Sequence, residues 1–146
     1  MRILGLMLVA ALSLCSCATK QLDTSTAPSV PSARVYVPEL LVPSTGKVAL
    51  TIARDTGFIG GGCIMAVYLD GRVVAGISHG EKVALQIAPG RHILGSGPNP
   101  GGTGLCRIGS DRSRRETELT AVLGQPLKYR LSISANGEFS ATPTAF

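Results

Sequence analysis

Two cysteines in the body of the chain, Cys63 and Cys106, are the side chains best suited to chemistry. A cysteine pair in an exported domain usually forms a disulfide. Closing this loop would stabilise a small domain by about 4 kcal/mol on the chain-entropy estimate. The alternative is a reactive Cys63 with His79 or His92 as its base, which needs a free thiolate and a third group to orient the base, and none stands out. We therefore predict a Cys63–Cys106 disulfide, no catalytic residues and no enzymatic activity.

Metal and phosphate chemistry are also disfavoured. The two histidines and the two cysteines are not at a spacing typical of zinc, so we predict no metal and no cofactor. The segment 97–103 superficially resembles a phosphate-binding loop, but it lacks the lysine before the hydroxyl residue and does not join a strand to a helix. We interpret 95–104, with five glycines and two prolines, as a flexible or disulfide-braced loop outside the core and as a candidate contact surface.

A basic cluster follows this loop, with acidic residues inside and directly after it. One interpretation is a solvated loop with local charge pairing, and the other is a contact with an anionic partner such as lipopolysaccharide phosphate or an acidic protein. Nucleic acid is disfavoured because no aromatic residues are interleaved for base stacking. The residues of this candidate interaction surface are Arg107, Arg112, Arg114 and Arg115.

Residues 1–16 have the organisation of a secretory signal peptide. A basic start precedes an apolar run over 3–14, which is too short to span a bilayer as a permanent helix. The run ends in Leu14-Cys15-Ser16-Cys17, which resembles the lipobox of bacterial lipoproteins. Cys17 fits that pattern better than Cys15, because a small serine precedes Cys17 whereas a bulky leucine precedes Cys15. The resemblance implies cleavage before Cys17 and lipid on its sulfur; an ordinary signal peptide with chance cysteines is the alternative.

Residues 17–32 are expected to form the lipidated cysteine and a flexible linker, since they are polar and contain few large apolar residues. Residue 18 is alanine, whereas an aspartate there marks inner-membrane retention in Gram-negative lipoproteins. The resemblance therefore implies a lipid anchor in the outer membrane, with the domain in the periplasm. Loss of Arg2 with the signal lowers the net charge from +5 to +4, and so small a net charge does not identify a binding partner. The remaining 33–146 suffice for one small domain.

The apolar patterning predicts about eight short strands and no helix. The clearest is 127–134, where four apolar residues alternate with polar ones. The segment 64–69 is apolar on both faces, which places it in the middle of a sheet. The predicted strands cover 34–37, 47–54, 64–69, 73–77, 82–87, 91–94, 116–123, 127–134 and 138–142, with a brief one at 105–107.

Turn signals separate these strands. Asp70-Gly71 and Asn136-Gly137 are typical of tight hairpins, and Pro89-Gly90 presets a further reversal. His79, beside a glycine, is interpreted as a turn residue, and His92 as structural. We predict an all-β domain, an antiparallel β-sandwich or small barrel of 7–8 strands, with short meander connections rather than crossovers.

The turn motifs carry a family resemblance. Residues 68–75 (Tyr-Leu-Asp-Gly-Arg-Val-Val-Ala), Gly80-Glu81 and 87–92 (Ile-Ala-Pro-Gly-Arg-His) resemble a group of small bacterial outer-membrane lipoproteins of unknown function with a PEGA-like β-domain. The resemblance implies an extracytoplasmic sandwich and brings no catalytic residues. The glycine-rich loop with Cys106 departs from the plain PEGA pattern.

Together these features predict a non-enzymatic, membrane-anchored lipoprotein that acts as a structural or interaction module of the cell envelope. Its expected partners are the membrane, through the lipid, and another envelope protein. The alternative is a binding protein or inhibitor that acts on an envelope hydrolase, a saccharide or another anionic ligand through the loops at 95–115.

Overall fold

The computed structural model describes residues 20–57, 60–107 and 113–145, and within them the chain is built of short strands with three single-turn 3₁₀ helices. None of the described helices is long and apolar enough to cross a bilayer. The predicted all-β fold is confirmed. The elements are η1 (Ser32–Arg34), η2 (Pro38–Leu41), β1 (Val48–Arg54), β2 (Met65–Leu69), β3 (Arg72–Ile77), β4 (Lys82–Ile87), β5 (Gly90–Pro98), η3 (Gly104–Arg107), β6 (Arg115–Ala121), β7 (Leu127–Ile133) and β8 (Phe139–Pro143).

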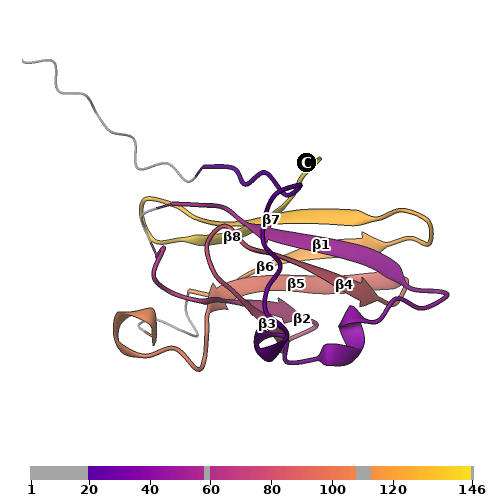
Figure 1. The fold of residues 1–146 in the computed structure, drawn as a ribbon, viewed down its shortest axis with the longest axis horizontal. Coiled ribbons are helices and arrows are strands. Elements are labelled where there is room, and N and C mark those ends of the chain that lie inside the picture. Colours follow the sequence, from indigo (N-terminus) through magenta and orange to yellow (C-terminus); the bar gives the residue numbers. More distant parts are fainter. Residues whose placement is uncertain (1–19, 58–59, 108–112, 146) are drawn as a thin grey trace, which may run out of the picture.

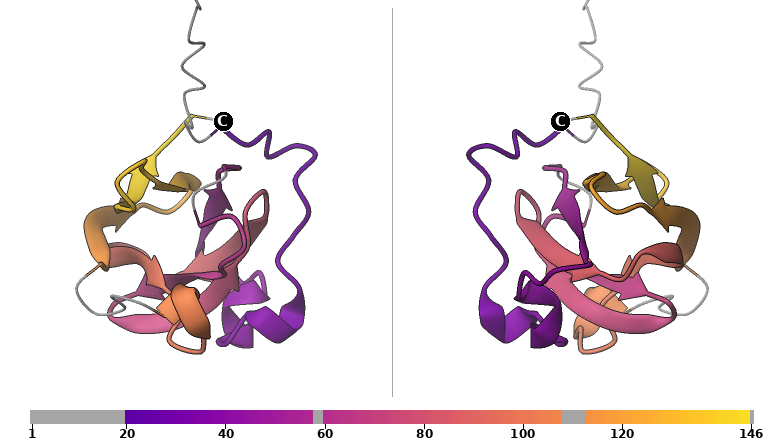
Figure 2. Two further views of the ribbon diagram at one scale, coloured as in Figure 1. Left: turned by 90° about the vertical axis from the view of Figure 1, so that its left-hand side faces the viewer. Right: turned by 90° about the vertical axis from the view of Figure 1, so that its right-hand side faces the viewer.

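The strands form two four-stranded sheets that pack face to face (Figures 1 and 2). One sheet has the order β4-β1-β7-β8 and the other β3-β2-β5-β6, so the fold is a sandwich and not a closed barrel. Five of the six strand pairs are antiparallel, and β1 and β7 are parallel, with Leu50 opposite Leu127.

The prediction of meander connections without crossovers is wrong. The chain changes sheet after β1, β3, β4 and β6. Pro89-Gly90 does reverse the chain, but it links β4 of one sheet to β5 of the other instead of joining a hydrogen-bonded pair. The Asp-Gly and Asn-Gly turns do join hydrogen-bonded pairs, β2–β3 and β7–β8, but the Pro-Gly reversal does not determine which sheet the next strand joins.

The core lies between the sheets and follows the predicted alternation. Val48, Leu50 and Ile52 of β1 face the same interior as Tyr129 and Leu131 of β7. All five residues of β2 are buried, and β2 lies between β3 and β5 as its two apolar faces predicted. Burial of this aliphatic surface from both sheets is the main stabilising contribution to the domain.

Three short predictions are corrected. Residues 34–37 make only an isolated bridge, at Val35, and 105–107 belong to the 3₁₀ turn η3 rather than to a strand. The strand predicted at 91–94 extends over Gly90–Pro98, so the first part of the glycine-rich segment is buried sheet and only the rest is loop. A β-carbon on Gly95 would lie 3.1 Å from Tyr68 Cβ, and one on Gly97 would lie 3.3 Å from Arg114 Cα. These glycines therefore permit close packing over the sheet rather than flexibility.

The segment predicted as a flexible linker is described from Lys20 onward and lies against the sandwich (Figure 2). We call residues 20–37 the N-terminal strap. Its backbone pairs with both sheets: Val30 N–H donates to Lys82 O at 2.8 Å, and Tyr36 N–H donates to Val74 O at 2.9 Å. Val30 is also part of the hydrophobic core. The packed domain therefore begins before residue 33, and the strap covers the edges of β3 and β4.

Candidate functional site

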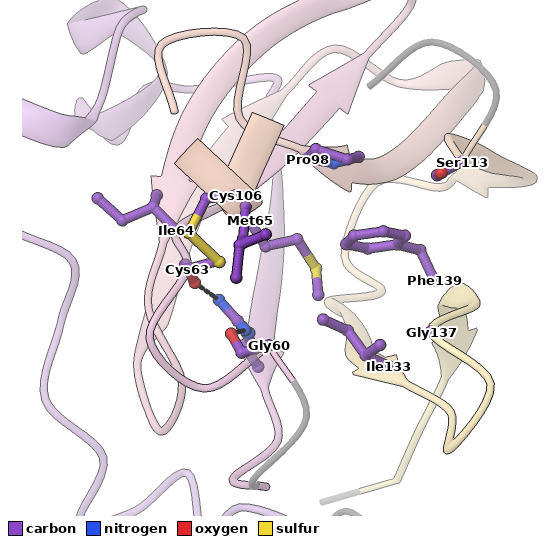
Figure 3. Close-up of a pocket in the computed structure, with 12 residues that line it drawn as sticks. Gly60, Cys63, Ile64, Met65, Pro98, Cys106, Ser113, Ile133, Gly137 and Phe139 are labelled. Atoms are coloured by element: carbon purple, nitrogen blue, oxygen red, sulfur yellow. Dashed lines mark hydrogen bonds between the residues drawn. A yellow bond between two sulfur atoms is a disulfide. The ribbon is translucent and has the colours of Figure 1, made fainter. Parts of the chain in front are cut away.

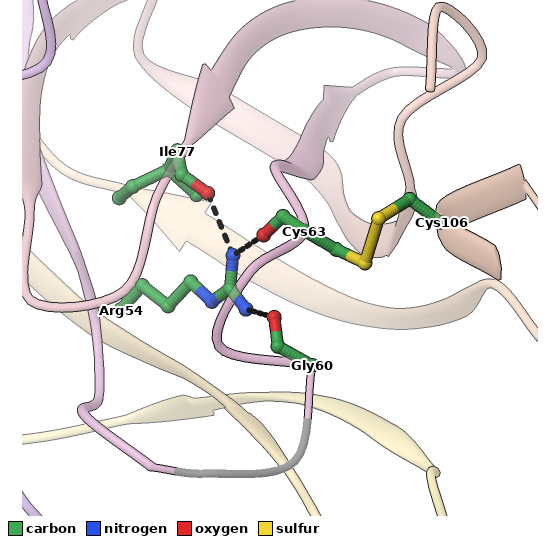
Figure 4. The surroundings of a disulfide bond; sticks show 5 residues. All are labelled: Arg54, Gly60, Cys63, Ile77 and Cys106. Atoms are coloured by element: carbon green, nitrogen blue, oxygen red, sulfur yellow. Dashed lines mark hydrogen bonds between the residues drawn. A yellow bond between two sulfur atoms is a disulfide. The ribbon is translucent and has the colours of Figure 1, made fainter. Parts of the chain in front are cut away.

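The predicted disulfide is confirmed: Cys63 and Cys106 are bonded, with their Cα atoms 5.3 Å apart. The bridge ties η3 to the corner between β1 and β2 (Figure 4). Since the sulfur of Cys63 is consumed in this bond, it is not a free nucleophile. His92, one of the two candidate bases for Cys63, lies near the start of β5. Pro98, at the other end of that strand, lines the same cavity as the disulfide, so His92 and the disulfide are toward opposite ends of β5.

Arg54 lies beneath this corner with only 2% of its surface exposed. Its Nη1 donates to Cys63 O at 2.5 Å and to Ile77 O at 2.9 Å, and its Nη2 donates to Gly60 O at 2.7 Å (Figure 4). The guanidinium thus holds the cysteine corner to β3. Burial lowers the pKa of Arg54 to about 10, although the negative charge of Glu81 partly opposes that shift.

Glu81 is shared by two arginines. Arg34 of the strap binds it through both oxygens, at 2.5 and 2.9 Å, and also donates to Gly76 O and Ser78 Oγ. Burial tends to raise the pKa of Glu81, but the hydrogen bonds from Arg34 and from Ser78 N–H and the charges of both arginines outweigh it and lower the pKa. Two cations share one carboxylate, so this cluster of Arg34, Glu81 and Arg54 has a net charge of +1.

A cavity of about 180 Å³ opens between the sheets at this end of the molecule (Figure 3). Arg54 and the disulfide form one wall of this cavity, and the side chains of Met65, Ile133 and Phe139 point into it. Leu105, on η3 at the rim, is 84% exposed. The arrangement is an apolar hollow with one buried cation in its wall and one exposed leucine at its rim, features that are typical of ligand-binding cavities.

The predicted arginine surface is only partly assembled. Arg114 packs over the ring of Tyr68, 4.4 Å from its centroid, and its Nε donates to Glu116 at 2.8 Å. Arg115 lies 3.7 Å from Glu138. Arg107 ends η3, and Arg112 lies outside the described residues. The described contacts of Arg114 and Arg115 thus agree with the interpretation of local charge pairing.

His92 and Asp70 form a pair that the sequence did not indicate. His92 Nδ1 lies 2.7 Å from Asp70 Oδ2, and its Nε2 lies 2.9 Å from Ala88 O. Partial burial opposes a charge on His92, but both ring nitrogens face acceptors, and these raise its pKa. Asp70 and Gly71 have φ of 50° and 81°, as the predicted tight turn requires. The pair therefore fastens the β2–β3 turn to β5 and is structural, as expected for His92. His79 is exposed in a turn.

Over the described ranges, no group of three His, Cys, Asp or Glu residues could hold a metal ion. The predicted lipidation residue, Cys17, lies outside them. What the fold and the disulfide define is a disulfide-bonded β-sandwich with an apolar cavity at one end. Comparison with protein families, with characterised proteins and with solved structures finds no match to this chain.

Sequence reasoning missed Arg54 and its neighbours. A signal was present, because Arg54 follows Val48, Leu50 and Ile52 at the same two-residue spacing and so had to face the interior. Glu81 and Arg34 lie 47 positions apart, and no local pattern joins them.

Proposed function

We propose that the protein is a membrane-anchored lipoprotein of the bacterial envelope whose sandwich acts as a non-enzymatic interaction module. The observation that carries this proposal is the Cys63–Cys106 bond, because disulfides form and persist in oxidising compartments outside the cytoplasm. The bond also holds η3 so that Leu105 is presented to solvent. The lipobox at Cys17 supplies the anchor, and the likeness of the turn motifs to small outer-membrane lipoproteins supports the same assignment.

A lipid on Cys17 would place the sandwich close to the membrane. Lys20 already pairs with Thr56, its N–H donating to Thr56 O at 2.7 Å. Three residue steps separate Cys17 from Lys20, and they span at most about 11 Å when fully extended. Thr56 lies two residues after Arg54, which lines the cavity, so this end of the sandwich would stand near the bilayer instead of on a long tether.

Lipidation is tested by matched serine variants. Full-length protein should be recovered from membranes with an acylated Cys17 at its mature terminus and with the internal disulfide intact, as mass spectrometry of the native protein measures. Cys17→Ser should abolish the acyl mass and release the protein from membranes, because a single residue carries the lipid. Cys15→Ser is the control and should leave both unchanged. Loss of the lipid in Cys15→Ser, or its retention in Cys17→Ser, would contradict the proposed anchor.

The interaction role is tested at Leu105. Truncating a residue that anchors an interface costs more than about 1 kcal/mol, so, with Leu105 as the proposed anchor, Leu105→Ser should reduce recovery of a crosslinked envelope partner by about tenfold. Leu123→Ser is the matched control, because Leu123 is 56% exposed in the turn after β6, away from η3. Equal recovery with both variants would argue against a partner on this surface.

A second function, a binding protein or inhibitor for an anionic ligand, is favoured by the cavity with Arg54 in its wall. Its cavity is lined by part of the predicted 95–115 region rather than by the arginine cluster, namely by Pro98, Leu105, Cys106 and Ser113.

A further inference from the structure

The cavity beside the disulfide has the charge and size of a ligand site. Its volume of about 180 Å³ is well below the roughly 300–1,000 Å³ of pockets for drug-sized molecules. It slightly exceeds the roughly 150 Å³ of an engineered apolar cavity that holds benzene. The space therefore suits one ring or one short branched chain.

The charge in its wall is not balanced by the described residues. Glu81 serves both Arg34 and Arg54, and Asp55, the next residue after Arg54, is paired with Arg130 on the outer face of the sheet. Buried charges in proteins are normally paired, since leaving one without a counter-ion is costly. An anion that entered the cavity would meet this requirement.

Arg54 also retains hydrogen-bonding capacity. A guanidinium has five N–H donors, and the contacts to Cys63, Ile77 and Gly60 in the described chain use three of them. Gly60 lies between Arg54 and Ile133. A β-carbon built on Gly60 would be 3.8 Å from Arg54 Nη2 and 2.6 Å from Ile133 Cδ1. Arg54 Nη2 and Ile133 therefore both lie around Gly60 in the wall of the cavity.

We propose that this cavity binds a small apolar carboxylate, its ring or branched chain against Met65, Ile133 and Phe139 and its carboxylate on Arg54. The site is independent of whether Cys17 carries lipid, so it stands or falls separately from the proposed anchor. A carboxylate is favoured over a neutral group because hydrogen bonds between charged partners are about twice as strong as neutral ones.

The test uses benzoate and benzamide, which share shape and differ in charge. Titration of the full chain, followed by NMR of the Met65 and Ile133 methyl groups, should show saturable shifts with benzoate. Benzoate should bind at least about tenfold more tightly than benzamide, the ratio expected for one charge-assisted contact. Equal affinities, no saturable binding, or shifts confined to the Arg114 surface would overturn the proposal.

Two variants locate the site. Arg54→Gln should remove the preference for benzoate, while Arg91→Gln, which alters an exposed arginine at the start of β5, should preserve it. Since Arg54 also braces the fold, Phe139→Trp provides a second arm: it fills the cavity and keeps the cation. That variant should lose binding of both probes, and undiminished benzoate binding by it would place the ligand elsewhere.

Discussion

Ser96 is a buried hydroxyl without a partner among the described residues. It is fully buried on β5, and its Oγ accepts and donates no hydrogen bond within the described chain. Burying an unpaired polar group costs about 1–3 kcal/mol, so Ser96→Ala should raise the free energy of unfolding by about 1 kcal/mol. Urea denaturation at unchanged m-value measures this.

The control for that substitution has the opposite sign. Ser132 Oγ lies 2.6 Å from Ser140 Oγ across β7 and β8, so Ser132→Ala removes a hydrogen bond and should lower stability by about 0.5–1 kcal/mol. If Ser96→Ala lowered stability as much as Ser132→Ala does, a partner for the Ser96 hydroxyl would have to exist.

The His92–Asp70 pair should make stability depend on pH. Because the folded state raises the pKa of His92, its contribution is complete below the unfolded value of about 6.5 and is lost as pH rises through the folded pKa. Because the pKa of Asp70 is lowered despite the opposing effect of burial, its contribution is complete above about 3.9 and is lost on acidification through the folded pKa. The pair thus contributes fully between about pH 4 and 6.5, by less than about 1 kcal/mol, since Asp70 is half exposed.

Asp70→Asn tests the pair, because asparagine tolerates the same left-handed turn and has no charge. NMR titration of the His92 ring should show a lower pKa in this variant than in the wild type, and the loss of stability on moving from pH 6 to pH 9 should shrink. His79→Gln, which removes the other histidine, controls for a general effect of charge. An unchanged His92 pKa in Asp70→Asn would show that Asp70 is not its partner.

The strands and the two tight hairpins, β2–β3 and β7–β8, were predictable from the sequence, whereas the pairing of strands far apart in the chain was not. The alternation in β1, β4 and β7 and the two apolar faces of β2 indicated which faces are buried, because each strand's own sequence shows which of its faces is apolar. The parallel pairing of β1 with β7 depends on contacts between residues more than seventy positions apart, such as Leu50 and Leu127. No turn motif encodes such a contact.

The composition of the glycine-rich segment was misleading for a different reason. Glycines are typical of loops, but in β5 they alternate with inward-facing residues and leave space for Tyr68 and Arg114 on the outer face. Similarly, the polar segment up to residue 32 looked like a linker because few of its residues, Val30 among them, enter the core. Of the candidate site, the disulfide was predictable from cysteine pairing, whereas the cavity and Arg54 needed the packing of both sheets.

At the scale of the whole molecule, the strap joins the two sheets along their β3 and β4 edges. Arg34 is the central contact, since its guanidinium reaches Glu81, Gly76 and Ser78 from one position in the strap. The pair is mostly buried, with 22% of the Arg34 and 14% of the Glu81 side chain exposed. Such charge-assisted bonds contribute more than exposed ion pairs, because neither partner is well solvated after the other is removed.

Arg34→Gln should therefore lower the free energy of unfolding by about 2 kcal/mol. Hydrogen exchange should also lose protection at Val30, Tyr36 and Lys82, whose amides join the strap to the sheets, while amides at the centre of β1 stay protected. Arg91→Gln is the matched control: the Arg91–Glu118 pair is exposed by 72% and 51%, so the cost should stay below about 0.5 kcal/mol. Equal losses in the two variants, or unchanged exchange at Val30 and Tyr36, would mean that the strap is held by its valines rather than by Arg34. In that case the strap would stay on the sheet edges without the ion pair, and the negative charge of Glu81 would be left to interact with Arg54 alone.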